Sequence, residues 1–283
     1  MKILITGSSG QVGSSLIKYL ASYKIIPISG KNCDLYNLKL LNKLIDIHQP
    51  DLIINTAAYT QVDLAEKEIE LAYRLNVFLP EFLAKKALEN DIPFIHFSTD
   101  YVFDGKKKDP YLESDLPNAL SVYGSTKLKG EQAVTKIDGH YFIFRTSWVY
   151  SSTGKNFYLT IKNLIKNKEK IKVVNDQIGV PTSNYFLSYQ INKLIPMLNK
   201  SNKGIYHLVP DGNSSWFEFA KTIIIYLKAE FNLRDLVPIK SDDLNFIARR
   251  PKNSILDNEK IKSTFMLEFD DWKTELERII NDA

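Results

Sequence analysis

The chain has 283 residues, of which 44% are hydrophobic and 25% charged, so it can build one large or two modest globular domains with a substantial core. Its formal net charge is +4, and the lysines are dispersed among acidic residues, a pattern that argues against nucleic acid or a membrane surface as a partner. The single cysteine, Cys33, excludes an intramolecular disulfide and fits a reducing compartment. Neither a secretory signal nor an apolar run of membrane-spanning length is visible, so we expect a cytoplasmic protein.

The chain opens with a dinucleotide-binding pattern. A short β-branched strand over residues 2–6 leads into the turn GSSGQVG and then a helical apolar pattern. Gly7 permits the tight turn, Gly10 lets backbone amides approach a pyrophosphate, and Gly13 lets the helix pack on the strand. The helix N-terminus then faces the anion. A glycine-rich turn without a ligand is the alternative, but its position directly after the first strand favours a cofactor.

The second strand, over residues 25–29, bears on the choice of cofactor. Pro27 is typical of an irregular or edge strand. The strand ends without the acidic residue that binds an adenosine ribose diol, and Lys31 is suited to a 2′-phosphate, so NADPH is permitted alongside NADH. Lys31 is alternatively an exposed loop lysine. Asp34 either lies with Leu35 against the adenine or caps a helix.

Strands and helices then alternate in the manner of βαβ units. Further strands are predicted over residues 51–55, 94–97 and 141–145, with a long helical region over 62–90 that Pro80 restarts or kinks. The third strand ends in residues that leave room for a cofactor: Thr56, Ala57, Ala58 and Tyr59. This alternation predicts an α/β fold with a doubly wound, Rossmann-type parallel sheet.

Past Tyr150 the alternation becomes irregular. Strands are predicted over 171–174 and 204–209, and a helix over 216–227 opens with Ser215 as its cap. We therefore expect residues 1–150 to form the dinucleotide-binding domain, completed by later segments, and residues 151–283 to form mainly a smaller α+β substrate-binding domain.

Three side chains have the chemistry to reduce a ketone, which needs hydride at carbon and a proton at oxygen. Tyr123 and Lys127 are four residues apart and share one face of a helix. A neighbouring ammonium lowers the pKa of a tyrosine, and Lys127 is also able to hold the nicotinamide ribose. Thr99, at the end of the fourth strand, can donate to the substrate carbonyl. Tyr-x-x-x-Lys pairs also arise by chance, but the nearby strand end and glycine-rich turn favour a catalytic site.

Two residues are candidates for the substrate side. Trp148 follows the fifth strand and is either a core aromatic or a ligand-binding residue at the carboxyl edge of the sheet. Arg250 has a planar guanidinium that suits a diphosphate, although the RRP sequence is also compatible with a surface turn.

The motifs resemble the extended short-chain dehydrogenase/reductase family and, within it, the dTDP-4-dehydrorhamnose reductases. The matching strings run from residue 7 to 254 and include GSSGQVG, NTAAYTQVDLAE, STDYVFDG, VYGSTKLKGE, VVNDQIGVPTS and RRPKNS. The resemblance implies NADPH- or NADH-dependent reduction of the C4 ketone of a nucleotide-linked 4-keto-6-deoxy sugar. It implies Tyr123 as proton donor, assisted by Lys127 and Thr99, and substrate contacts at Thr99, Asp100 and Trp148. The implied cofactor contacts are Gly10, Gln11, Val12, Asp34, Leu35, Ala58, Tyr59 and Thr60.

Departures from the family pattern bear on metal binding and on rival functions. Some of these reductases carry a Glu soon after the glycine turn that helps bind Mg²⁺ at a dimer contact. Here Ser14 and Ser15 follow, which disfavours a metal-linked dimer; we name no metal ligand, and Mg²⁺ stays an open but disfavoured alternative. The expected state is a monomer or homodimer. A non-catalytic regulatory subunit, like the similar β subunit of methionine adenosyltransferase, is disfavoured by the intact Thr99, Tyr123 and Lys127. A nucleotide-sugar dehydratase of this scaffold uses Asp-Glu after the Thr. Here Thr99 is followed by Asp100 and Tyr101, so the second acid is missing. An epimerase is disfavoured only by the motif strings.

Overall fold

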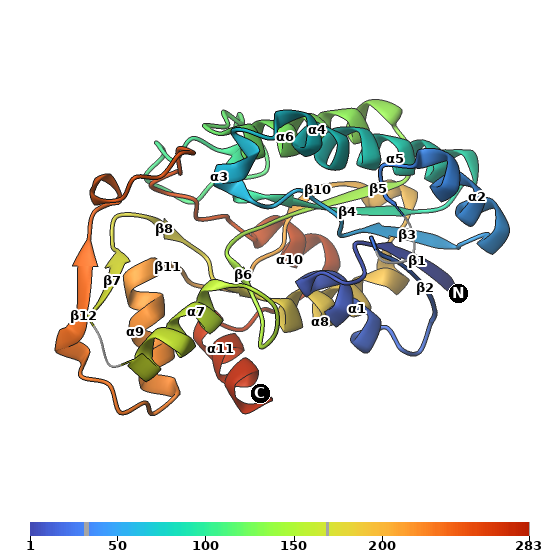
Figure 1. Ribbon diagram of the computed structural model, residues 1–283. Coiled ribbons are helices and arrows are strands. Elements are labelled where there is room, and N and C mark those ends of the chain that lie inside the picture. The colour runs from blue at the N-terminus through green and yellow to red at the C-terminus, as the bar shows by residue number, and fades with distance from the viewer. Residues whose placement is uncertain (31–33, 168–169, 283) are drawn as a thin grey trace.

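A six-stranded parallel sheet forms the centre of the protein, seen in a computed structural model that describes residues 1–30, 34–167 and 170–282 (Figure 1). The strand order is β10-β5-β4-β3-β1-β2, and all neighbouring pairs are parallel. The strands are β1 (Lys2–Thr6), β2 (Lys24–Ile28), β3 (Leu52–Asn55), β4 (Phe94–Thr99), β5 (Tyr141–Thr146) and β10 (Gly204–His207). The predicted parallel α/β sheet is confirmed, and Pro27 lies in the edge strand β2.

Helices cover both faces of this sheet because successive side chains of each strand point to opposite sides. Ile3 and Ile5 pack towards one set of helices and Leu4 towards the other. One face is covered by α1 (Gln11–Tyr19), α8 (Asn184–Leu194) and α10 (Glu259–Phe265); the other by α2 (Leu38–His48), α4 (Ile69–Tyr73), α5 (Leu79–Glu89) and α6 (Val122–Ile137) (Figure 1). The strand order reverses between β1 and β3, which opens a crevice at their carboxyl ends, the usual ligand position in such sheets.

The predicted helix over 62–90 is interrupted. It consists of α3 (Val62–Ala65), α4, a π-helical turn η1 (Arg74–Phe78) and α5, with Pro80 in the first turn of α5. The π-turn directs Asn76 inward, where its side-chain oxygen accepts from the Tyr59 amide (2.9 Å) and its nitrogen donates to Thr126 (3.0 Å). These hydrogen bonds connect the loop after β3 to α6, so the interruption helps to fix one wall of the crevice.

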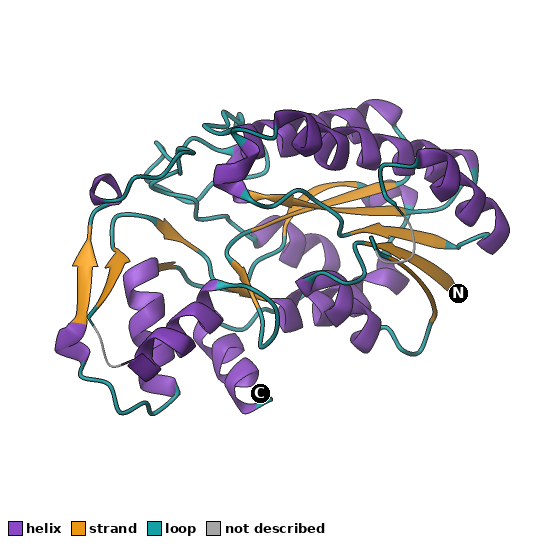
Figure 2. Cartoon of the chain, in the orientation of Figure 1, coloured by secondary structure: helices purple, strands orange, loops and turns teal. Residues whose placement is uncertain are grey.

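A second, smaller body lies beside the carboxyl edge of the sheet (Figure 2). Its core includes Tyr150, Tyr158, Phe219 and Trp272. Its helices and strands are β6 (Val149–Tyr150), α7 (Phe157–Leu164), β7 (Ile171–Val174), β8 (Ile178–Gly179), β9 (Thr182–Ser183), β11 (Ser214–Ser215), α9 (Trp216–Tyr226), β12 (Leu236–Ile239) and α11 (Trp272–Asn281). Short 3₁₀ turns complete the chain: η2 (Asp100–Val102), η3 (Ile165–Asn167), η4 (Ile195–Met197), η5 (Lys200–Asn202), η6 (Leu233–Asp235) and η7 (Ser241–Asp243). Ser215 caps α9 as expected, accepting from the Glu218 amide at 3.1 Å.

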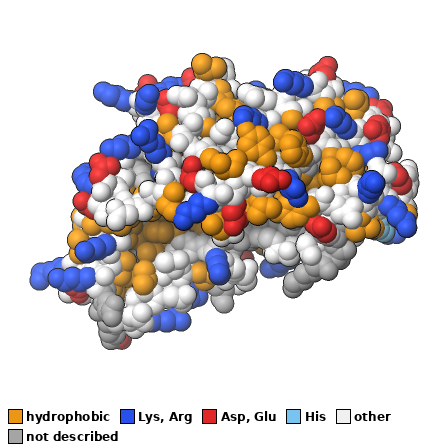
Figure 3. Space-filling model, turned by 45° about the horizontal axis from the view of Figure 1, so that its top comes forward, with side chains coloured by type: hydrophobic (Ala, Val, Ile, Leu, Met, Phe, Trp, Pro, Cys, Tyr) orange, Lys and Arg blue, Asp and Glu red, His pale blue; other side chains and the backbone are white. Residues whose placement is uncertain are grey.

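The later half of the chain is divided between the two bodies. The segment predicted as a strand over 204–209 forms β10 at the edge of the main sheet, and α8 and α10 pack on that sheet. Cationic and anionic side chains are interspersed on the face shown in Figure 3, with hydrophobic side chains gathered between them. Within the described ranges, every helix is too short or too polar to cross a membrane.

Candidate functional site

A cavity of about 500 Å³ lies at the carboxyl ends of β1, β3, β4 and β5. It brings together the glycine-rich turn, the end of β4, the first turns of α6 and the segment after β5. Its lining residues are Gly10, Gln11, Val12, Thr56, Ala58, Thr60, Val62, Phe97, Ser98, Thr99, Asp100, Tyr101, Tyr123, Lys127, Thr146, Ser147, Trp148, Val149, Lys155 and Trp216. Most of the expected site residues therefore meet at one place, although they are far apart in sequence.

The glycines of the turn differ in what they do. Gly7 has φ +71°, and a Cβ there would lie 2.5 Å from the Ala57 amide nitrogen; a Cβ on Gly13 would overlap the Gly7 carbonyl oxygen. These two glycines shape the turn and its packing against the loop after β3. Gly10 and Gln11 instead line the cavity at the start of α1. The Gln11 side-chain oxygen also accepts hydrogen bonds from Ser151 and Asn156, both at 2.8 Å, which ties the loop after β6 to the turn.

The remaining expected cofactor residues lie in different places. Ala58 and Thr60 line the cavity, whereas Ala57 is buried beside Gly7 and the Tyr59 hydroxyl donates to Glu68 at 2.6 Å. The Asp34 side chain accepts from the Tyr36 amide, and Leu35 packs against the core. Helix α2 is capped by Asn37, so the helix-cap interpretation of Asp34 is wrong. Lys31 lies outside the described residues.

Thr99 and Asp100 terminate β4 as buried polar residues. The Thr99 hydroxyl donates to Asp100 Oδ1 at 2.9 Å and accepts from the Tyr101 amide at 3.2 Å. Burial raises the pKa of Asp100 to about 6. The Thr99 hydroxyl is thus held at the cavity wall by a carboxyl group and must rotate away from it to reach a ligand.

Tyr123 and Lys127 enter the cavity from α6, whose N-cap Ser121 accepts from the Gly124 amide. Burial raises the pKa of Tyr123 to about 12, opposed by a hydrogen bond with Thr99 and reinforced by the charge of Asp100. Burial lowers the pKa of Lys127 to about 8. Lys127 Nζ donates to the Phe97 carbonyl oxygen at 2.6 Å. In this structure the phenol pKa is therefore raised, not lowered as expected from the spacing, because desolvation outweighs the hydrogen bond with Thr99.

The cavity fits a nicotinamide dinucleotide. The Ser98 and Thr146 hydroxyls are buried on its wall and have no hydrogen-bond partner among the described residues, so a polar ligand would satisfy them. Helix α1 also begins at this cavity, and no described side chain caps its N-terminus. Sequence reasoning missed Lys155 and Trp216, which line the same cavity. Trp216 is the first residue of α9, and nothing in its spacing indicated that it faces the site.

Trp148 is part of an aromatic wall. It adopts φ +47°, and its ring stacks on Trp216 with centroids 3.6 Å apart. A Cβ on Gly179 would lie 2.6 Å from the Trp148 ring, so the backbone of β8 closes on it from the other side. The position of Trp148 at the cavity, rather than in a closed core, agrees with a ligand-binding role.

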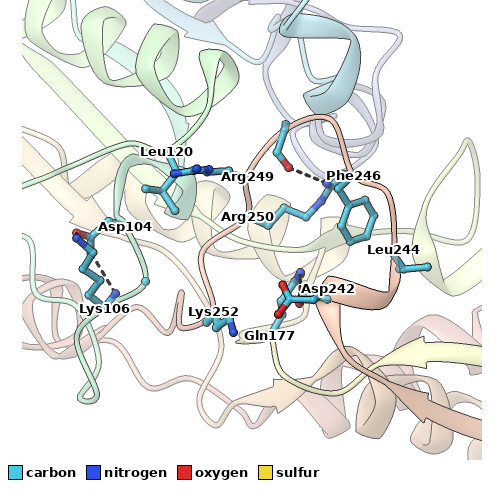
Figure 4. Close-up of a pocket in the computed structure, with 13 residues that line it drawn as sticks. Asp104, Lys106, Leu120, Gln177, Asp242, Leu244, Phe246, Arg249, Arg250 and Lys252 are labelled. Carbon is cyan, nitrogen blue, oxygen red and sulfur yellow. Dashed lines mark hydrogen bonds and ion pairs between the residues drawn. The ribbon is translucent and has the colours of Figure 1, made fainter.

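Arg250 lies in a neighbouring cavity of about 740 Å³ and not in the one that holds Tyr123 (Figure 4). Its guanidinium forms a two-point ion pair with Asp63, at 2.6 and 3.2 Å, and lies 3.6 Å from the Phe246 ring centroid. Asp63 belongs to α3, whose Val62 lines the first cavity, so this ion pair stands between the two. Other cations of the second cavity are Lys106, Arg249 and Lys252.

Among residues 1–30, 34–167 and 170–282, no group of three or more His, Cys, Asp or Glu side chains is arranged to hold a metal ion. Ser14 and Ser15, which follow the glycine turn, are both hydrogen-bonded within the fold. Ser14 donates to the Gly10 carbonyl and Ser15 to the Asn184 carbonyl.

Comparison with known proteins gives one consistent family. The family described as "RmlD substrate binding domain" matches residues 1–283. The chain is 38% identical to a protein of Escherichia coli K12 named dTDP-4-dehydrorhamnose reductase, covering 100% of this chain and 98% of that one. A protein of the same name from Burkholderia thailandensis is 36% identical, with 96% of each chain covered. The crystal structure of dTDP-4-dehydrorhamnose reductase from Bacillus anthracis in complex with NADP superposes with a TM-score of 0.94 at 37% identity, covering 100% and 99% of the two chains.

Proposed function

The chain belongs to the family of dTDP-4-dehydrorhamnose reductases, and from that premise we propose that it is an oxidoreductase that uses NADPH or NADH to reduce the C4 ketone of a nucleotide-linked 4-keto-6-deoxy sugar. The substrate we propose is dTDP-4-dehydro-L-rhamnose, giving dTDP-L-rhamnose. The observation that carries the proposal is the convergence of Thr99, Tyr123 and Lys127 on the cavity that also receives the glycine-rich turn.

The proposed mechanism assigns one task to each side chain. Hydride for the ketone carbon is supplied by the reduced nicotinamide when it is bound. Tyr123 holds its proton at neutral pH, because its pKa is about 12, and donates it to the ketone oxygen. Lys127, with a pKa of about 8, can return a proton to the phenolate. The Thr99 hydroxyl turns from Asp100 to the ketone oxygen and orients it.

Gly10, Gln11, Val12, Ala58 and Thr60 are proposed to hold the cofactor, and Lys127 to hold its ribose. Asp34, Leu35, Tyr59 and Lys31 stay predictions for the adenosine end. The residues that line the site supply the polar and anion-binding groups that such a ligand needs. NADPH and NADH are both retained as cofactors.

The substrate side is proposed to use both cavities. Asp100, Trp148 and its stacking partner Trp216 face the sugar next to Tyr123, and the cationic second cavity receives the nucleotide diphosphate. Arg250 can serve the diphosphate only where its ion pair with Asp63 is shared or exchanged. We accordingly propose that residues 1–150, with β10, α8 and α10, bind the dinucleotide, and that most of 151–283 binds the substrate.

We also propose a cytoplasmic enzyme that acts as a monomer or homodimer on a small molecule, without nucleic acid. The mixed charge of the face in Figure 3 supports the expectation that nucleic acid is not a partner. The regulatory-subunit and dehydratase or epimerase alternatives are not favoured by the named relatives.

The test measures oxidation of NADPH or NADH as the loss of the near-ultraviolet absorbance of the reduced cofactor. The substrate is generated from dTDP-4-dehydro-6-deoxyglucose by a 3,5-epimerase. Oxidation that requires the epimerase supports the proposed substrate, and oxidation without it indicates another 4-keto sugar. A protein that binds cofactor and oxidises none of it in either mixture contradicts the proposal.

Tyr123→Phe tests the proton donor. We expect turnover to fall by at least about a hundredfold while cofactor binding is retained, because only the hydroxyl is lost. Tyr73→Phe is the matched control, since that hydroxyl lies on the exposed side of α4, where it accepts from Lys129. Retention of activity in Tyr123→Phe would exclude Tyr123 as the acid.

A further inference from the structure

A buried polar chain runs beneath Lys127 across three neighbouring strands. Thr6, Asn55 and His96 are register partners on β1, β3 and β4, and all three are 0% exposed. Thr6 donates to Asn55 Oδ1 at 2.7 Å, Asn55 Nδ2 lies 3.0 Å from His96 Nδ1, and His96 Nε2 lies 3.5 Å from Lys127 Nζ. The mechanism proposed above uses only the last residue of this chain.

Asn55 determines where His96 carries its proton. The Ala57 backbone amide donates to Asn55 Oδ1 at 3.1 Å, and because a backbone N–H can only donate, that atom must be the amide oxygen. The side-chain NH₂ of Asn55 therefore faces His96 Nδ1 and donates to it. Burial holds the pKa of His96 well below its usual value, so the ring is neutral and its single proton is on Nε2.

The ring consequently presents an N–H to Lys127. An N–H facing Nζ is attractive when Nζ keeps its lone pair and repulsive when it is an ammonium. Two groups near Nζ favour the charged form: the Phe97 carbonyl oxygen, which accepts from Nζ at 2.6 Å, and Glu131 on the same helix, which is itself paired with Arg145 of β5 at 2.7 Å. Tyr123 and the Asp100 carboxyl face the same cavity.

We propose that His96 is a positioning residue for Lys127: with its proton fixed on Nε2 by Asn55, it favours the neutral amine of Lys127 and keeps that side chain able to accept and release a proton near neutral pH. This role of His96 in proton exchange rests on the proposed reductase function. The effect of His96 on the titration of Lys127 can be tested without that function. It would make Asn55, a residue that does not line the cavity, a determinant of the alkaline limit of activity.

The first test uses no substrate. In protein labelled with ¹⁵N at its four histidines, two-bond ¹H–¹⁵N spectra distinguish protonated from unprotonated ring nitrogens, and His96→Phe identifies the His96 signals. We expect a neutral ring with its proton on Nε2 throughout the neutral range. A proton on Nδ1, or a ring that titrates near pH 6.5, overturns the proposal.

Asn55→Asp then reverses the tautomer with almost no change of shape. A carboxylate only accepts, so His96 must carry its proton on Nδ1 and turn the Nε2 lone pair to Lys127, which then favours the ammonium. We expect Lys127 to titrate at least about one pH unit higher. The ¹³Cε signal of Lys127 reports this titration, and the signal is identified because it is missing from the spectrum of Lys127→Met. The alkaline limit of kcat/KM should move in the same direction.

Thr6→Val is the matched control. It removes a donor from the same Asn55 oxygen but leaves the Ala57 amide in place, so the fold loses stability while the His96 tautomer and the Lys127 titration stay unchanged. If Asn55→Asp flips the tautomer and Lys127 does not respond, or if Thr6→Val shifts Lys127 as much, the link from His96 to Lys127 is wrong. An inactive protein with the expected spectra would contradict the reductase function alone.

Discussion

Replacing Lys127 by Met should make the protein more stable near neutral pH, although the residue is proposed to be essential for turnover. Lys127 is 2% exposed, and burial lowers its pKa from 10.5 to about 8. One pKa unit corresponds to about 1.4 kcal/mol, so a charged Lys127 costs the fold about 3 kcal/mol. Because the folded-state pKa of a base is depressed, this cost is complete below about pH 8 and disappears above about pH 10.5.

Met keeps most of the length of the side chain and cannot be charged. It also loses the hydrogen bond to the Phe97 carbonyl; the part of that bond that depends on charge belongs to the pKa of Lys127, and the remaining part is lost equally at every pH. The difference in unfolding free energy, Lys127→Met minus wild type, is therefore expected to fall by about 2 kcal/mol between about pH 7 and pH 9.5. Urea unfolding at both pH values measures it, with Lys136→Met, an exposed lysine of the same helix, as control. A difference that is constant with pH, or equal to that of Lys136→Met, would refute the reasoning.

Two further substitutions test the glycine turn and the end of β4. Gly13→Ala places a Cβ on the Gly7 carbonyl and is expected to cost on the order of 2 kcal/mol in urea unfolding and to weaken cofactor binding. Gly30→Ala, whose Cβ would meet no described atom within 4 Å, should do neither, and equal effects would contradict this. Asp100→Asn should stabilise the fold by up to about 3 kcal/mol at pH 7 and by nothing below about pH 4. Burial raises the pKa of Asp100 to about 6, so the wild-type protein loses stability as pH rises through 6 and the buried carboxyl ionises, whereas Asn stays neutral. Unfolding free energies that differ equally at pH 4 and pH 7 would exclude this explanation.

Sequence reasoning reached the sheet and the main cavity because both depend on local patterns. The strands are apolar runs of the right length, and the glycine turn and the end of β4 lie at carboxyl ends, which a parallel sheet gathers at one edge. The π-turn at Arg74–Phe78 was not predictable in this way. It depends on Asn76 meeting Tyr59 and Thr126, contacts between segments that periodicity does not relate.

Arg250 and Trp216 show the same limit on the substrate side. The role of Arg250 at a diphosphate stays a prediction; its partner Asp63 is 187 residues away in the chain, and no local pattern indicates that the two meet. Trp216 begins an amphipathic helix and resembles a core residue in sequence; only the stack on Trp148 brings it to the cavity.

The largest difference between sequence and structure concerns the charges of the site. From spacing alone, an ammonium four residues from a tyrosine should lower the pKa of the phenol. Burial acts on both groups and disfavours the charged form of each, so it raises the pKa of Tyr123 to about 12 and lowers that of Lys127 to about 8, while Asp100 titrates at about 6. Between pH 6 and 8 the cavity therefore combines an ionised Asp100, a charged Lys127 and a protonated Tyr123. This combination suits a proton donor that must be refilled after each turnover, and its alkaline boundary is set by Lys127, the side chain that His96 contacts from below.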